Sequence, residues 1–144
     1  FDRRGDAGVM KLLKEASELE FLHPGANNMR MSLLLIASTS CEVCAGFKPV
    51  YESLERKIGN CCDFYVAIAE DVGGRSLLRE AFRKQFDRKY NGFPSLFVIL
   101  LGGGLLEIPY GTAMWNKNTG NFDENLIINY LEENKVIQRD GSQS

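Results

Sequence analysis

The sequence predicts a single α/β domain, because segments with helical and with strand-like patterns alternate along its 144 residues. The apolar segment 31–38 is typical of a central parallel strand that is covered on both faces. Two cysteines, Cys41 and Cys44, follow this segment and open a long amphipathic stretch. The chain shows no internal repeat and no linker-like segment, so we expect one domain over residues 1–144.

The first half of the chain is expected to contain two helices and two strands. Apolar residues at helical spacing predict an N-terminal helix at about 7–20. After the strand at 31–38, a second helix should run from about residue 41 to 57. It should bend at Pro49, because a proline removes one hydrogen bond from a helix interior. The next strand is expected at 63–69.

The second half should contain two further helices and a hairpin. A helix is predicted at 75–89, where apolar residues recur at every fourth position. Two apolar segments, 95–101 and 105–109, are joined by three glycines, which favours a β-hairpin. The final helix is expected at about 123–135, and residues 139–144 should form a frayed tail.

The Cys41–Cys44 pair is the main indication of function. Two cysteines separated by two residues can close into a small disulfide ring and reopen. A helix N-terminus carries unpaired backbone N–H groups and a partial positive charge, which favour a thiolate. Only the thiolate attacks a disulfide, so a pair at this junction suits thiol–disulfide exchange. A CxxC pattern alone also serves zinc sites, and its position between a strand and a helix is what favours redox chemistry.

Four features along the chain together resemble the thioredoxin superfamily. A CxxC opens a helix, Pro49 lies five residues after Cys44, Pro94 directly precedes a strand, and Tyr110–Gly111 follows the next strand. The resemblance covers about residues 30–135, which we take as the core of the domain. It implies a three-layer α/β/α fold with a mixed sheet of four to five strands and flanking helices. It also implies a cis peptide bond before Pro94.

The resemblance implies a protein disulfide oxidoreductase that acts on protein thiols or disulfides. Cys41 would attack and form a mixed disulfide, and Cys44 would resolve it. We expect no organic cofactor and no metal; the partners would be a protein substrate and a redox partner protein. The candidate substrate-binding residues are Ser40, Phe93, Pro94, Gly111 and Trp115.

The chain departs from the family pattern at the positions that usually support proton transfer. Ser40 stands where most members have an aromatic residue, and Leu35 stands where many have a buried acid. The lysine often found on the following strand is also missing. These departures favour an alternative function, a redox-inactive or weakly active thioredoxin-like interaction module within a larger assembly.

The remaining cysteines and the only tryptophan leave two questions open. Cys61 and Cys62 should form a strand-start pair with one thiol inward and one outward, and a vicinal disulfide or redox sensor is the alternative. About sixteen helical residues would separate them from the CxxC by ~24 Å, too far for one shared zinc ion. Segment 112–122 is expected to be a lengthened loop. Its Trp115 either caps the core or replaces the missing aromatic beside Ser40 and shapes the substrate groove.

The net charge and the first residue of the sequence give expectations about binding partners and cellular compartment. A net charge of −2 argues against a general role at nucleic acids or membrane surfaces, and no apolar run approaches a membrane span. The basic residues of helix 75–89 should form a solvated face, with an acidic partner as the alternative. Because the chain begins at Phe1, it is a processed product, a trimmed chain or a chain with an unseen beginning. A removed targeting segment would favour a secretory, periplasmic or organellar compartment.

Overall fold

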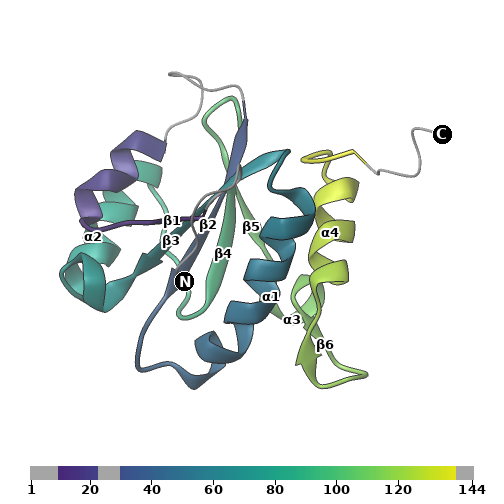
Figure 1. Ribbon diagram of the computed structural model, residues 1–144. Helices are drawn as coiled ribbons and strands as arrows, with labels where there is room; N and C mark the ends of the chain where they lie inside the picture. The colour runs from purple at the N-terminus through teal and green to yellow at the C-terminus, as the bar shows by residue number, and fades with distance from the viewer. Residues whose placement is uncertain (1–9, 23–29, 139–144) are drawn as a thin grey trace.

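The computed structural model describes residues 10–22 and 30–138, and its centre is a five-stranded mixed sheet (Figure 1). The strands lie in the order β1-β3-β2-β4-β5, where β1, β3 and β2 are parallel and β4 and β5 are antiparallel to their neighbours. Their bounds are Lys11–Leu12 (β1), Met31–Ala37 (β2), Cys62–Ile68 (β3), Ser95–Ile99 (β4) and Leu105–Ile108 (β5). The frayed tail expected at 139–144 lies outside the described residues.

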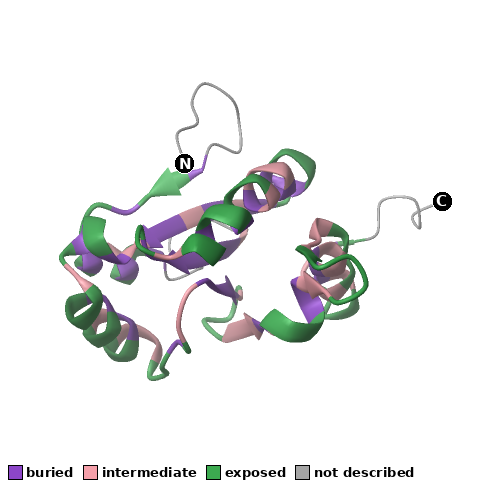
Figure 2. Ribbon diagram, turned by 90° about the horizontal axis from the view of Figure 1, so that it is seen from below, coloured by how far each residue is buried: buried purple, intermediate pink, exposed green. Residues whose placement is uncertain are grey.

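Helices cover both faces of the sheet, which confirms the three layers expected from the sequence (Figures 1 and 2). One face carries α1 and α4, and the other carries the 3₁₀ helix η1 and helix α2. The bounds are Ala16–Leu22 (η1), Glu42–Ile58 (α1), Ala69–Val72 (the 3₁₀ helix η2), Arg75–Phe86 (α2), Tyr110–Ala113 (α3) and Glu124–Glu133 (α4). A two-stranded hairpin, formed by β6 (Trp115–Asn116) and β7 (Asn121–Phe122), lies beside α1.

Strand β2 is the centre of the fold, as the sequence predicted. Its side chains alternate between two apolar clusters, so that Leu33 and Leu35 face α1 and α4, whereas Leu34 and Ile36 face η1 and α2. All four are essentially inaccessible to solvent. Because both faces of the strand are covered, its sequence is apolar almost throughout.

The helix predicted at 7–20 is wrong over residues 10–20, and residues 7–9 lie outside the described residues. Residues Lys11 and Leu12 instead pair with Tyr65 and Val66 of β3 as a short edge strand, and the 3₁₀ helix η1 follows. The buried residues of η1 are Ala16, Leu19 and Leu22. Their spacing of three matches the 3.0-residue turn of a 3₁₀ helix rather than the 3.6-residue turn of an α-helix.

Two further elements differ from the sequence prediction. Helix α2 ends three residues earlier than expected, because Asp87 adopts a left-handed conformation with φ 56° and donates its N–H to Arg83. Segment 112–122 is not a plain loop, since it contains the end of α3 and the β6–β7 hairpin. The Asp123 carboxylate accepts a hydrogen bond from Asn116 (3.0 Å) and caps the start of α4 through the N–H of Asn125.

Candidate active site

The two cysteines of the CxxC lie where β2 leads into α1. Cys41 is the N-cap of α1 with extended backbone (φ −104°), and its Sγ accepts a hydrogen bond from the N–H of Cys44 at 3.1 Å. The Cys41 thiol also points at the carbonyl oxygen of Phe93, 3.7 Å away. The helix start and the segment before β4 therefore meet at the Cys41 sulfur.

The two thiols differ sharply in exposure. Cys41 is partly exposed, whereas only 6% of Cys44 is accessible. Burial, together with the hydrogen bond between the two cysteines, raises the pKa of the Cys44 thiol to about 12. At neutral pH Cys44 therefore remains a protonated thiol, and Cys41 is the cysteine of this pair that an external reagent can reach.

This difference predicts the order of alkylation. In a reduced Cys61→Ser variant, which removes the exposed thiol outside the site, iodoacetamide near neutral pH should label Cys41 before Cys44 and Cys62. Peptide mapping by mass spectrometry at increasing reaction times measures the order. Equal or preferential labelling of Cys44 would contradict the assignment of Cys41 as the accessible thiol.

The segment before β4 brings Phe93 and Pro94 to the cysteines. The Phe93–Pro94 peptide bond is cis, and Pro94 is buried. Phe93 is half-buried, with its ring 5.8 Å from the ring of Tyr90. Ser95 donates a hydrogen bond to the carbonyl oxygen of Gly92 (2.6 Å) across this turn. Both residues that the sequence named here thus lie at the Cys41 side of the fold.

A polar network that the sequence did not reveal holds the segment before Cys41. The Glu70 carboxylate accepts hydrogen bonds from the Thr39 N–H (2.9 Å) and the Ser38 hydroxyl (2.7 Å). These hydrogen bonds lower the pKa of Glu70 to about 2. Glu70 therefore stays ionised at neutral pH and is a poor acceptor for a cysteine proton.

Ser40 contacts a cation rather than an aromatic side chain. The Arg75 guanidinium donates to the Ser40 hydroxyl (3.3 Å) and lies 5.1 Å from the centre of the Phe93 ring. Arg75 belongs to the basic helix α2, so the start of this helix forms one rim of the site. The basic surface predicted for α2 thus includes a residue that contacts Ser40, the neighbour of Cys41.

The opposite rim is formed by α3 and the hairpin. Tyr110, at the start of α3, is 40% exposed; partial burial raises its pKa, and the nearby Cys41 and Cys44 raise it further. The next residue, Gly111, is exposed, and a Cβ there would meet no described atom within 4 Å. The sequence had pointed to Gly111 as a substrate-binding residue. In the structure it is the neighbouring Tyr110 whose pKa is affected by the two cysteines.

Trp115 lines a groove along α1. Its ring packs edge-on against Phe122 with ring centres 5.2 Å apart. The groove has a volume of about 530 Å³ and is lined by Glu42, Val43, Gly46, Val50, Trp115, Asn121 and Phe122. Trp115 therefore lies along the Val43 side of the helix start, whereas the Ser40 hydroxyl contacts the side chains of Arg75 and Ser38.

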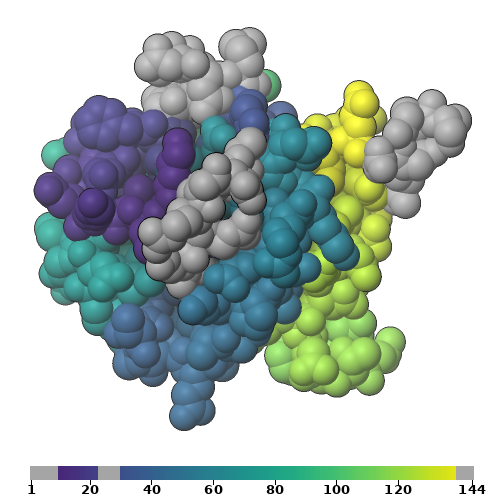
Figure 3. Space-filling view, in the orientation of Figure 1, coloured from purple at the N-terminus to yellow at the C-terminus, as the bar shows by residue number. Residues whose placement is uncertain are grey.

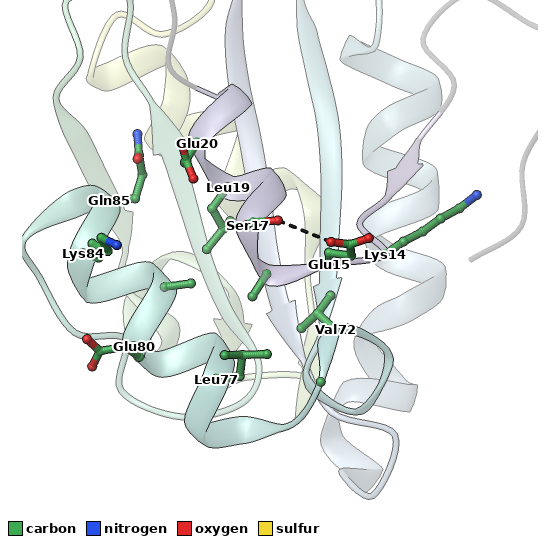
Figure 4. A pocket seen from close by; sticks show the side chains of 13 residues that line it. Lys14, Glu15, Ser17, Leu19, Glu20, Val72, Leu77, Glu80, Lys84 and Gln85 are labelled. Carbon is green, nitrogen blue, oxygen red and sulfur yellow. Dashed lines mark hydrogen bonds between the residues drawn. The ribbon is translucent and has the colours of Figure 1, made fainter.

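A smaller hollow reaches both cysteines from a third side. Its volume is about 230 Å³, and its lining includes Cys41, Cys44, Ser38 and Lys48. It is open to solvent, so a water molecule has a route to the otherwise buried Cys44 thiol. A larger groove of about 730 Å³ lies between η1 and α2 and is lined by residues such as Leu19, Val72 and Leu77 (Figure 4); it shares no lining residue with the cysteine site.

Cys61 and Cys62 lie at the opposite end of α1 from the CxxC. Cys61 is exposed and Cys62 is fully buried, so one thiol points outward and one inward, as expected. Within residues 10–22 and 30–138, no group of three or more His, Cys, Asp or Glu side chains is placed to hold a metal ion. Among the helices of the same described residues, none is long and apolar enough to cross a membrane.

The chain matches solved structures but no family model and no curated protein sequence. A mutant thioredoxin from Halobacterium salinarum NRC-1 superimposes with a TM-score of 0.58 at 14% identity, over 91% of this chain and 95% of that one. The J-Trx1 fragment of ERdj5 also gives 0.58, at 12% identity, over 87% of this chain and 49% of the other. A redox protein from Chlamydomonas reinhardtii gives 0.55 at 18% identity, over 73% and 32% of the two chains. The protein therefore has the thioredoxin-like fold.

Proposed function

We propose that the protein is a thiol–disulfide oxidoreductase that acts on protein substrates through Cys41 and Cys44. The observation that carries the proposal is the asymmetry of the pair. The accessible Cys41 sulfur lies at a helix N-terminus and accepts a hydrogen bond from the Cys44 N–H, and Cys44 stays protonated directly behind it. This asymmetry supports Cys41 as the attacking thiol and Cys44 as the resolving thiol.

The reaction runs in two exchanges. The Cys41 thiolate attacks one sulfur of a substrate disulfide, so that a new S–S bond forms and the other substrate sulfur leaves as a thiolate and takes up a proton from water. Cys44 then gives its proton to water and attacks the Cys41 sulfur, which frees the second substrate sulfur. Two electrons have passed to the substrate, and the Cys41–Cys44 disulfide is reduced again by a dithiol partner protein.

The backbone before β4 is suited to hold the substrate. The Phe93 carbonyl oxygen points at the Cys41 sulfur, and Pro94 closes that segment against the core. An extended substrate chain attached to Cys41 would run beside this segment and pair with its backbone, in the manner of strand addition. Arg75 and Tyr110 would flank such a chain on either side.

Trapping of the mixed disulfide tests the proposal. A Cys44→Ser variant should remain covalently joined to a disulfide-containing protein such as insulin, because the resolving thiol is gone, whereas the wild type should release its product. Non-reducing gel electrophoresis with mass mapping identifies the bond. Cys61→Ser is the matched control and should behave as the wild type. A Cys41→Ser variant that reduces insulin as fast as the wild type would refute the proposal.

The interaction module remains a second candidate because the described residues lack the usual acid for proton transfer. Leu35 is a buried apolar side chain where a relay acid would stand, and the Glu70 carboxylate is held ionised by Thr39 and Ser38. A module of this kind would bind its partner without either cysteine. Capture of the same partner by wild type and by a Cys41→Ser, Cys44→Ser double variant, without any turnover by the wild type, would favour it.

A further inference from the structure

The groove between α1 and the β6–β7 hairpin begins at the two residues that separate Cys41 and Cys44. Two of its lining residues, Glu42 and Val43, are the residues between the two cysteines. The hairpin supplies the opposite wall, and Figure 3 shows its light-green atoms on the same face as the blue N-terminal half of α1. Cys41 itself lines the smaller hollow, and a chain bonded to its sulfur would reach this groove across Glu42 and Val43.

The walls of the groove are apolar and held in place. Val43 is 44% exposed, although it is a β-branched apolar residue at a helix start. Phe122 packs against Phe47 (ring centres 4.9 Å apart), Tyr110 (5.5 Å) and Trp115 (5.2 Å), so the hairpin wall is fixed to the core through an aromatic cluster. The groove is thus formed before any ligand arrives.

Gly46 keeps the α1 side of the groove open. Glycine weakens a helix interior relative to alanine, so its use there calls for a reason. A Cβ at Gly46 would meet no described atom within 4 Å, which means that packing within the protein does not require glycine. At Gly59, in contrast, a Cβ would lie 2.4 Å from the carbonyl oxygen of Glu55. Gly46 lines the groove, so its missing side chain leaves space there.

We propose that this groove is a specificity subsite for one large apolar or aromatic side chain of the polypeptide whose cysteine is bonded to Cys41. The inference rests on the proposed function and adds the class of substrate. The occupant belongs to a polypeptide because it must reach the groove from the Cys41 sulfur across Glu42 and Val43. It is apolar because Val43, Val50, Trp115 and Phe122 form most of the lining, with Glu42 as the one charged residue.

The test uses two peptide disulfides that differ at one residue next to the cysteine, leucine in one and glycine in the other. The ratio of their second-order rate constants with the reduced protein reports the subsite and is independent of the absolute reactivity of Cys41. The wild type should favour the leucine peptide by about tenfold or more, the usual discrimination of an apolar pocket. Gly46→Leu should bring the ratio near one by filling the groove, and Gly46→Ala, which adds a single methyl group, should keep most of it.

A second variant changes the hairpin wall of the groove. Trp115→Ala should also lower the ratio, and thermal unfolding of each variant checks that it is folded. A wild-type ratio near one, or a Gly46→Leu ratio equal to that of the wild type, would overturn the subsite while leaving the thiol chemistry intact. If the wild type reacts with neither peptide nor with hydroxyethyl disulfide, the proposed function fails and the subsite fails with it.

Discussion

A Leu35→Asp variant should lose about 2–4 kcal/mol of stability and reduce disulfides faster than the wild type in its folded fraction. The loss follows because Leu35 is 1% exposed, between Val66 and Leu96 on the neighbouring strands, and the change exchanges apolar burial for a buried polar group. The gain follows because Leu35 shares its apolar cluster with Cys44. A carboxyl buried there has a raised pKa and can take the proton of Cys44 near neutral pH.

Two matched variants separate the effect of a proton-accepting carboxyl from the effect of burying any polar group in the core. Leu34→Asp carries the same change on the other face of β2, away from Cys44, so it should cost similar stability without any gain in rate. Leu35→Asn keeps the size and polarity but cannot accept the proton. Insulin reduction driven by a chemical dithiol, measured after urea unfolding curves establish that each variant is folded, compares them. A folded Leu35→Asp variant that is no faster than Leu35→Asn would show that water reaching Cys44 through the smaller hollow suffices.

The reduced protein should lose stability steeply as the pH rises from 9 to 12. Burial raises the pKa of both Cys44 and Cys62 from 9.0 to about 12. Below pH 9 both thiols are protonated in the folded and unfolded chains, so neither contributes a pH dependence. Above pH 9 the unfolded chain releases these protons and the folded protein does not, which favours unfolding. For Cys62, three pH units at ~1.36 kcal/mol each amount to about 4 kcal/mol.

Urea unfolding at several pH values across this range, with the free energy of unfolding plotted against pH, measures the loss. The slope should be smaller for Cys62→Ala, because that variant lacks one of the titrating thiols. It should also be smaller for the oxidised protein, because a Cys41–Cys44 disulfide removes the proton of Cys44. Burial also raises the pKa of Tyr51, Tyr65, Tyr90 and Tyr110 in all three samples. Cys62 adds to the shift of Tyr51, and Cys41 and Cys44 add to that of Tyr110, so removing these thiolates changes the slope in the same direction. Equal slopes for wild type and Cys62→Ala would contradict the prediction.

The sequence predicted well those elements whose buried residues follow a regular pattern along the chain. Strand β2 is covered on both faces, so its apolar run identified it, and α1 buries one regular face through Phe47, Tyr51 and Leu54. The N-terminal segment was misjudged because a spacing of three, as in Ala16, Leu19 and Leu22, is hard to tell from helical spacing over so few residues.

The β6–β7 hairpin could not be predicted because its strands have two residues each and carry no periodic pattern. Its fold depends on contacts with distant parts of the chain or across the turn. Phe122 packs on Phe47 of α1, and Asn116 donates a hydrogen bond to Asp123. Such contacts are set by the tertiary structure, and local sequence gives little sign of them.

The residues of the candidate site also fall into two groups, those recognisable from local motifs and those brought in by tertiary contacts. Cys41, Cys44, Phe93 and Pro94 could be named because a CxxC and an X-Pro peptide are recognisable where they stand, and their strands β2 and β4 are neighbours. The contacts of Glu70 and Arg75 could not be predicted because their side chains reach Ser38, Thr39 and Ser40 across the fold. One signal was present: Glu70 follows β3, and the carboxyl ends of the parallel strands β2 and β3 lie at the same edge.

The position of β2 also determines how the protein exchanges its amide hydrogens. Strand β2 is hydrogen-bonded to β3 on one side and to β4 on the other, and its interior residues are fully buried. Its amides should therefore exchange with deuterium only when the whole protein unfolds, whereas the two-residue strands of the β6–β7 hairpin should exchange through local opening. Cys41 would then follow a strand that exchanges only on global unfolding, while the groove wall of Trp115 and Phe122 would belong to a unit that opens locally.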